Sequence, residues 1–383
     1  MTPSKILILL TLGFLAGVFV GSFLSFSWLA AFVLLLAAAA AFVIGSKRAG
    51  GRAIVLGFLI VFVFIGFARA SLAPAAANFE EIQIFERSRL ALAERSQEII
   101  GGQEQALFAA MVFGYTDNLS AETKEVFNRT GTRHLIAISG MNLTIVAALA
   151  FSFLIFVGFW RRWAFYVALA GVVLFVLLVG APASAVRAGI MAGLFLLSRH
   201  LGRLAEAWRL LLLAAFLMVI LNPRVFVFDL GFQLSFLAVL GLIAFTPFFE
   251  RLLQFIPLEP LRQLISMSLA AQVTTWPLIA STFKTFSVIG PLANIVTVPL
   301  MPLVMIFGLL FLVFGWWSLL AKVVLWPAWL ILHFVSSTLS WLNQFKYASV
   351  DIAWFGIIFS IIYYILLVLF YWRFVRKDNN VRI

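Results

Sequence analysis

The chain has 383 residues, of which 64% are hydrophobic and only 11% are charged, and its formal net charge is +12. Soluble domains are about 45–50% apolar and about 25% charged, so this composition excludes an ordinary soluble protein. The absence of cysteine excludes disulfides and thiolate metal sites.

Apolar runs long enough to cross a bilayer recur along most of the chain. We predict an all-α polytopic membrane protein with about twelve transmembrane helices, some of them broken into half-helices. The predicted spans lie at 6–26, 28–45, 53–72, 143–160, 163–180, 185–199, 209–221, a run interrupted at 229–235 that continues to 249, 264–281, 303–317, 323–343 and 353–372.

The charges predict an orientation. Lys47, Arg48 and Arg52 lie between the second and third spans and are expected in the cytoplasm, because short cytoplasmic loops collect Lys and Arg. Both termini are then cytoplasmic, and segment 74–142 lies outside. We divide the chain into N-terminal transmembrane helices (1–73), an external amphipathic segment (74–130), a transmembrane core (131–375) and a cytoplasmic tail (376–383).

The external segment shows a helical stripe. Phe79, Ile82 and Phe85 are three residues apart, and Phe85, Leu92 and Ile99 are seven apart, with charged residues between them. This period is that of an amphipathic helix, which breaks at Gly101-Gly102 and resumes from Gln103 to Phe113. We expect the helix to lie on the outer membrane face or to pack on the helix bundle.

The stretch TGTRHLIAISGMNLT, residues 130–144, breaks before a long apolar run begins. Arg133 and His134 precede a short apolar piece, which ends at Ser139 and Gly140 and is followed by Asn142. Irregular backbone at membrane depth is tolerated only where protein buries it or where it lines a wet cavity. We expect a half-helix and a turn beside a pore or active site; the alternative is an ordinary loop that leads into a span.

Further polar groups interrupt the later apolar runs. They are Arg187, Asp229 with Gln233 and Ser235, Gln272 with Thr275, and Asn294. An ionisable residue within a span costs about 2.5–3.5 kcal/mol on insertion scales, so these groups are expected to face the bundle interior or water. They suggest a polar path. Arg187 and Asp229 alternatively form a structural ion pair, or Arg187 reaches the membrane interface with its long side chain.

Two common motifs, one for nucleotides and one for metals, are absent from the sequence. The chain lacks the G-x-x-x-x-G-K-[ST] and H-E-x-x-H patterns, and its three histidines, His134, His200 and His333, have no metal-ligand spacing. We therefore expect no cofactor and no enzymatic activity. The pair Ser139-Gly140 leaves a serine intramembrane hydrolase open as an alternative.

Four blocks resemble one known family. The piece HLIAISGMNL is similar to a signature of the ComEC-type competence channel family. PASAVRAGIM at 182–191 and DLGFQLSFLAVLG at 229–241 resemble two further blocks of that family, in the same order. The segment 272–277, with Asn294 and Pro299, resembles its later elements. The family's usual histidine after S-G-L is replaced here by Asn142.

The resemblance implies an inner-membrane channel that carries single-stranded DNA into the cytoplasm during natural transformation. Its implied partners are single-stranded DNA, the lipid bilayer, separate pilus or receptor components, and a cytoplasmic helicase or ATPase and a nuclease. We expect a minimal channel core without the family's OB-like and metallo-β-lactamase-like domains. The candidate residues of the DNA path are Arg133, His134, Ser139, Asn142, Ser184, Arg187, Asp229, Gln233, Ser235, Gln272, Thr275 and Asn294.

The physics of the cargo agrees with such a path. A strand that carries a charge on every phosphate needs a wet, basic and sequence-independent route. Arg133, Arg187, Arg224, Lys284 and Lys346 are the bases expected near the outer half of the membrane. A transporter or flippase for another anionic or lipidic substrate is the alternative function.

Overall fold

The protein is helical almost throughout, as predicted. A computed structural model describes residues 3–23, 50–71, 85–136, 138, 140–200, 207–352 and 354–375. The predicted span 28–45, Ser139 and the tail 376–383 lie outside these residues. The chain divides into two compact units, Met1–Glu80 with Leu204–Phe236 (unit 1) and Glu81–Arg203 with Leu237–Ile383 (unit 2).

Seven helices in the part of the chain that the structure describes are long and apolar enough to cross a membrane. They support a multi-pass membrane protein, but they do not confirm a count of twelve spans. The seven are Ile6–Phe23, Arg161–Leu178, Leu230–Leu252, Glu259–Phe283, Gly290–Phe314, Ser318–Asn343 and Ile357–Val375. Four shorter apolar helices are Gly57–Ser71, Asn142–Phe156, Ser184–Leu194 and Ala207–Leu221.

Unit 1 is built on close contact between two helices, α1 (Pro3–Phe23) and α3 (Gly50–Ser71). Gly13, Gly17 and Gly21 recur every four residues along α1, and a Cβ added at Gly21 would lie 2.6 Å from the Phe67 carbonyl oxygen. Small residues at this spacing let two membrane helices approach closely. The unit also contains α11 (Ala207–Leu221) and α12 (Val225–Phe228), which contact α1.

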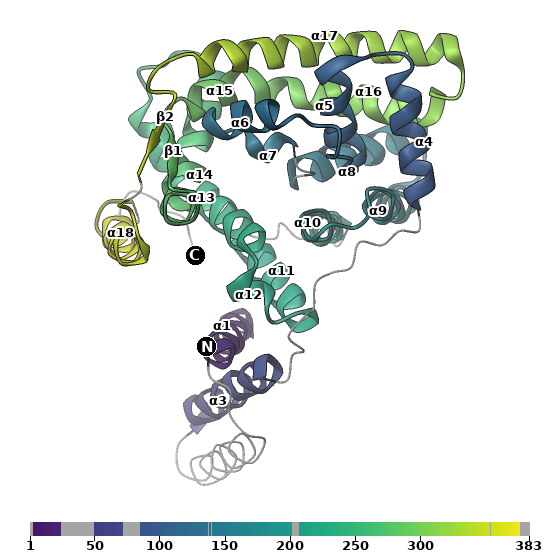
Figure 1. Cartoon of the computed structure of the whole chain (residues 1–383). Helices are drawn as coiled ribbons and strands as arrows, with labels where there is room; N and C mark the ends of the chain where they lie inside the picture. The colour runs from purple at the N-terminus through teal and green to yellow at the C-terminus, as the bar shows by residue number, and fades with distance from the viewer. Residues whose placement is uncertain are drawn as a thin grey trace. The chain divides into compact units, whose positions relative to one another are not determined.

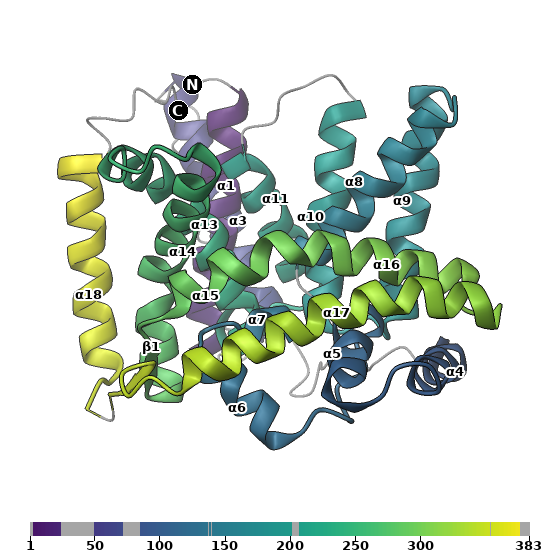
Figure 2. The ribbon, with the colours of Figure 1, turned by 90° about the horizontal axis from the view of Figure 1, so that it is seen from above.

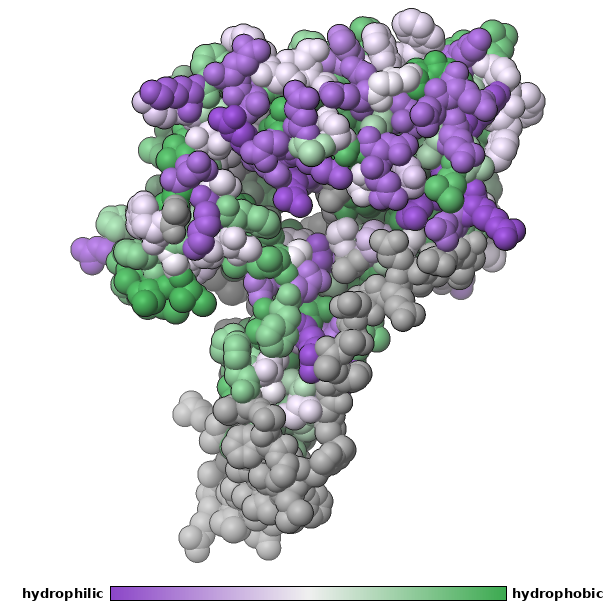
Figure 3. Space-filling model, in the orientation of Figure 1, coloured by the Kyte–Doolittle hydropathy of each residue, from purple (hydrophilic) through white to green (hydrophobic). Residues whose placement is uncertain are grey.

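Unit 2 combines a polar layer with apolar helices, and Figure 1 labels the helices of both. The polar layer holds α4 (Glu86–Gln97) and α6 (Ala121–Arg129), and hydrophilic side chains gather over both helices (Figure 3). The apolar helices are α8 (Gly140–Phe156), α9 (Arg161–Leu178), α10 (Ala183–His200), α13 (Leu230–Leu252), α14 (Glu259–Phe283), α15 (Gly290–Thr297), α16 (Met301–Phe314), α17 (Ser318–Asn343) and α18 (Ile357–Phe370). The first residues of α13 belong to unit 1.

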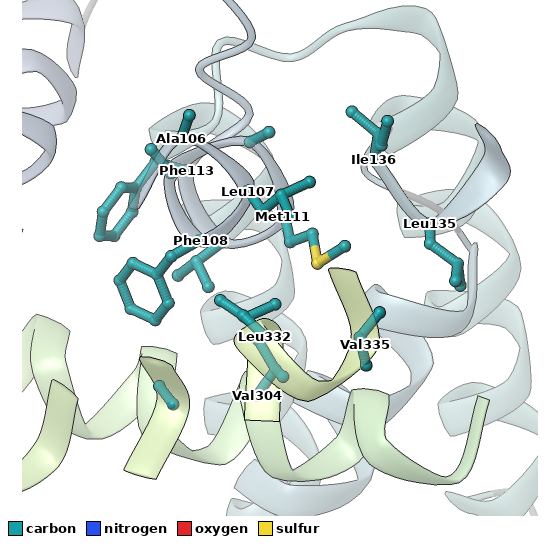
Figure 4. Close-up of a cluster of buried hydrophobic side chains, with 14 of the residues drawn as sticks. Ala106, Leu107, Phe108, Met111, Phe113, Leu135, Ile136, Val304, Leu332 and Val335 are labelled. Atoms are coloured by element: carbon teal, nitrogen blue, oxygen red, sulfur yellow. The ribbon is translucent and has the colours of Figure 1, made fainter. Parts of the chain in front are cut away.

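Helix α5 (Gly102–Phe113) corrects the predicted stripe. Only α4 keeps one buried face, whereas every residue of α5 from 105 to 113 is buried. Figure 4 shows Phe108 and Met111 of α5 beside Val304, Leu332 and Val335 of α16 and α17. A helix that is apolar on all sides is a core helix rather than a surface helix. The glycine pair at 101–102 therefore separates a surface helix from a buried one.

Helices α16 and α17 lie across α8, α9, α10 and α14 (Figure 2). Helix α17 buries one face, which includes Leu325, Leu332 and Leu339, against the core that contains α5. The opposite face exposes large apolar side chains, among them Val323, Trp326 and Leu330. Since both faces are apolar, the sequence alone predicts a membrane span here and does not show which face is buried.

Helix α4 is fastened to two turns of unit 2. Arg89 donates to the Val179 carbonyl oxygen after the last turn of α9, at 3.1 Å. Arg95 donates to the Ser318 hydroxyl at the start of α17, at 2.7 Å. The first bond satisfies a carbonyl group at the end of α9 that has no intrahelical partner.

A short ribbon was not predicted. Strands β1 (Thr285–Ser287) and β2 (Ser349–Asp351) pair antiparallel, with Thr285 opposite Asp351 and Ser287 opposite Ser349. Strands of three residues give too short an alternation of polar and apolar positions to be recognised in a sequence. The ribbon joins the end of α14 to the segment between α17 and α18.

Candidate functional site

The predicted break at 130–144 is present. A short helix, α7 (Arg133–Ile136), ends before α8 begins at Gly140. Leu135 and Ile136 are buried, whereas Arg133 and His134 are exposed. The turn before α7 is placed by Gly131, whose φ of 71° is a left-handed conformation that glycine adopts without strain. The break therefore sends two polar side chains out of an otherwise buried segment.

Asn142 lies in the first turn of α8 and is 2% exposed. Its Nδ2 donates to the Met111 carbonyl oxygen at 3.4 Å. Met111 is in the last turn of α5, where carbonyl groups have no intrahelical partner. Asn142 thus joins the start of α8 to the end of α5. A shorter side chain at this position would not reach the Met111 carbonyl oxygen.

Arg187 lies on α10 and is 6% exposed, and Ser184 is half-buried one turn before it. Helix α10 packs on α8, and a Cβ added at Gly140 would lie 4.0 Å from the Ala188 Cβ. The structure therefore brings the first turns of α8 and α10 together. This places Asn142 and Arg187 at neighbouring helix starts, as a shared site would require.

Asp229 and Gln233 close the corner between α12 and α13 in unit 1. Asp229 is the residue before α13, and its Oδ1 accepts from the Phe232 backbone N–H at 3.0 Å, which is an N-cap bond. Gln233 Nε2 donates to the carbonyl oxygens of Val227 at 2.6 Å and Phe226 at 3.3 Å. Both side chains satisfy backbone groups where the helix is interrupted. Ser235 is half-buried one turn into α13.

The structure brings Gln272 and Asn294 into one polar strip between α14 and α15. Gln272 Nε2 donates to the Ser287 carbonyl oxygen at 2.8 Å, and Asn294 Nδ2 donates to the Ser268 hydroxyl at 2.8 Å. Ser268 and Gln272 are one turn apart on the same face of α14. Thr275 stays outside the strip, because its hydroxyl donates to the Ala271 carbonyl of its own helix at 2.8 Å.

Sequence reasoning missed two members of this strip, Ser268 and Ser287. The four-residue spacing of Ser268 and Gln272 was the available signal for the first. The side-chain oxygens of Asn294 and Ser287 are buried and have no hydrogen-bond partner among the described residues. Such atoms cost free energy unless a polar group or water meets them. The strip is therefore a partly buried polar seam between two apolar helices of unit 2.

The remaining predicted groups are placed as follows. His333 Nδ1 lies 2.8 Å from Glu104 Oε1, and its ring stacks on Trp329 with the centroids 5.0 Å apart. Ser139, the residue on which the serine hydrolase alternative depends, lies outside the described residues. Within the described ranges no three His, Asp or Glu side chains gather as metal ligands would.

Comparison with known proteins identifies the family. The family model described as "Competence protein" matches residues 111–377. ComE operon protein 3 from Bacillus subtilis (strain 168) is 30% identical over 190 residues, which are 50% of this chain and 24% of that relative. The chain thus matches about a quarter of the relative's length. No solved structure matches the chain.

The matched region includes all of the candidate residues described above. It contains the α7–α8 break, the first turns of α10, the α12–α13 corner and the α14–α15 strip. It also covers well over half of the chain. The chain therefore belongs to the competence protein family, as its four sequence blocks predicted.

Proposed function

We propose that this chain forms the membrane path by which single-stranded DNA enters the cytoplasm during natural transformation. One observation carries the proposal: the region that matches the competence family is built almost entirely of apolar helices. A protein made of such helices contributes to competence in the membrane rather than in solution. The membrane is also the barrier that a polyanion cannot cross unaided.

The interrupted helices support a path rather than a simple anchor. Unit 2 has polar side chains at helix starts, on Asn142 and Arg187, and along the α14–α15 strip. An anchor has no need of buried polar groups, which are costly in a bilayer. A path for phosphate requires them, because a charged strand needs polar and basic surroundings within the membrane. Arg187 is the candidate that attracts phosphate.

In this proposal the chain itself catalyses no reaction. The chain lacks the G-x-x-x-x-G-K-[ST] pattern, and we assign the energy for transport to a separate cytoplasmic helicase or ATPase. Degradation of the non-transported strand is likewise assigned to another protein. The chain sits in the plasma membrane with both termini in the cytoplasm.

Uptake of fluorescently labelled DNA by cells with and without this gene tests the proposal. We expect deletion to abolish entry into the cytoplasm, while DNA still binds at the cell surface. Complementation with Arg187→Gln at normal protein abundance should restore little uptake, and Arg187→Lys should restore more, because it keeps the charge.

The controls separate the alternatives. Full uptake by deleted cells would refute a DNA path and would favour a transporter or flippase for another anionic or lipidic substrate. Full uptake by Arg187→Gln alone would remove Arg187 from the path and leave the proposed function in place. Protein level must be measured for each variant, because an unpaired buried partner of Arg187 would lower abundance.

A further inference from the structure

A surface around the β1–β2 ribbon gathers bases from separate parts of the chain. We call it the ribbon patch and define it by Arg129, Arg133, Lys284, Lys346 and the exposed aromatic side chains beside them. Arg129 ends α6, Arg133 begins α7, Lys284 follows α14 and Lys346 precedes β2. Arg133, Lys284 and Lys346 are exposed, and Arg129 is half-buried.

Hydrogen bonds connect these segments on one side of the ribbon. Arg129 Nε donates to the Ser349 hydroxyl of β2 at 3.2 Å, so α6 is held against the ribbon. Ser349 pairs in register with Ser287 of β1. The turn at Gly131 approaches the same strand, because a Cβ added there would lie 2.9 Å from the Ser287 side chain. Figure 1 shows the ribbon beside α6.

The other bases lie at the two ends of β1. Lys284 directly precedes β1, and the Arg133 guanidinium lies 5.6 Å from the ring centroid of Phe283, its neighbour. At the far end of β1, the Val288 N–H donates to the Ala348 carbonyl at 3.1 Å, next to the turn that carries Lys346. Because β1 has only three residues, about 10 Å of strand separates these ends.

Exposed aromatic rings lie beside the bases, and Lys284 Nζ donates to the carbonyl oxygen of Phe355, the residue after Trp354, at 2.8 Å. Phe283 is 45% exposed, Tyr347 is 69% exposed and Trp354 is 68% exposed. Lys346 Nζ lies 5.7 Å from the centroid of its neighbour Tyr347. Basic side chains that follow a phosphate backbone, combined with rings on which bases stack, are the features of proteins that bind single strands without sequence preference.

The acids nearby do not cancel the charge. Asp351 lies on β2, and α6 adds Glu122 and Glu125 together with Lys124. With Lys124 added to the four bases of the patch, there are five basic side chains and three acidic ones. The patch therefore keeps a positive charge that attracts phosphate and makes binding sensitive to salt.

We propose that the ribbon patch binds single-stranded nucleic acid where the strand first reaches this chain, an inference that rests on the proposed function. Bases and aromatic rings also anchor proteins at lipid headgroups. The ribbon favours the nucleic acid, because Thr285, Ser287, Ser349 and Asp351 make one of its faces entirely polar. It also lies against α6, which belongs to the polar layer. A patch that borders the polar layer in this way gains nothing from insertion into lipid.

Binding of a labelled oligothymidylate to the full chain in neutral phosphatidylcholine nanodiscs tests the proposal by fluorescence anisotropy. The test variant is Arg133→Gln with Lys346→Gln, since both side chains are exposed. The matched control is Arg87→Gln with Lys322→Gln, two exposed bases on α4 and α17. We expect the salt slope, d log K/d log[salt], to fall by about 1.4 in the test variant and to stay unchanged in the control.

That change in slope corresponds to roughly 25-fold weaker binding at about 0.1 M salt. Equal binding by the test variant and the control would overturn the proposal. So would unchanged oligonucleotide binding with a loss of phosphatidylglycerol retained from the cell membrane, which would identify the patch as a lipid anchor. DNA uptake by cells with the unmodified gene is scored separately, so a failure of the patch is distinguished from a failure of the proposed function.

Discussion

Polar residues inside apolar runs act on the backbone at the helix breaks of this protein. Asp229 caps α13, Gln233 bonds the last carbonyls of α12, and Asn142 bonds the end of α5. Each break leaves backbone groups without intrahelical partners, and no water in the hydrocarbon replaces them. A role in the break and a role in a path are compatible, because a break is also where polar groups gather.

Asp229 separates the two roles. We expect Asp229→Ala to lower the free energy of unfolding in detergent by about 0.5–2 kcal/mol, because the N-cap bond to Phe232 is lost. Asp229→Asn should stay close to the unmodified protein, since Asn caps as well as Asp does. Asp117→Ala, at an exposed turn residue, is the control and should change little. Normal stability with failed DNA uptake in Asp229→Asn would instead mean that the carboxylate charge is required in the path.

Close helix contacts in unit 2 depend on small residues at particular places. A Cβ added at Gly241 of α13 would overlap the Ala270 carbonyl oxygen and the Thr274 hydroxyl of α14. That hydroxyl donates to the Leu237 carbonyl at 2.8 Å and so links the two helices. Helix–helix association in membranes relies on such packing and on such polar bonds, because lipid gives little hydrophobic driving force.

The substitution Gly241→Ala should therefore destabilise the protein by about 1–3 kcal/mol, since the added methyl must push α13 away from α14. Gly171→Ala in α9 is the matched control, because no atom lies within 4 Å of the added Cβ. It should leave stability unchanged or raise it by about 0.5–1 kcal/mol, the helix propensity difference. Thermal unfolding in one detergent measures both. Equal effects of the two substitutions would show that α13 and α14 are not in close contact at Gly241.

At the scale of the whole molecule, polar and apolar surfaces separate within unit 2. Helix α6 of the polar layer follows the end of α5, to which the start of α8 is bonded. Helix α8 has 17 residues, so its far end lies about 25 Å away. Arg161 and Arg162 follow that far end. This arrangement agrees with opposite sides of the membrane for the polar layer and the α8–α9 turn.

Reporter fusions test the orientation. A reporter near Asn118, between α5 and α6, should read external, and reporters after Arg162 and after Arg382 should read cytoplasmic. The reason is the charge of the short loops, since Lys and Arg are retained on the cytoplasmic side. An external signal at Arg162 would contradict the orientation, because α8 is expected to begin on the external side and to cross the membrane before Arg162.

The sequence by itself determined the class and the family. Its apolar runs predicted a helical membrane protein, and the blocks around Gly140, Arg187 and Asp229 predicted the competence family. The break before α8 could be predicted because Ser-Gly and a polar Asn interrupt an apolar period locally. Such signals depend on neighbouring residues and need no knowledge of distant contacts.

Only the tertiary structure decided which polar groups meet and which helices are covered. Gln272 and Asn294 come together because α15 packs on α14, whereas Thr275, nearer in sequence to Gln272, bonds its own helix. Helix α5 is buried on all sides, although the sequence around it suggested a surface stripe. The ribbon patch combines residues that are far apart in the sequence, such as Arg129 and Ser349, which are 220 positions apart. An apolar period shows that a face is buried, but it does not show against what, because packing partners come from distant parts of the chain.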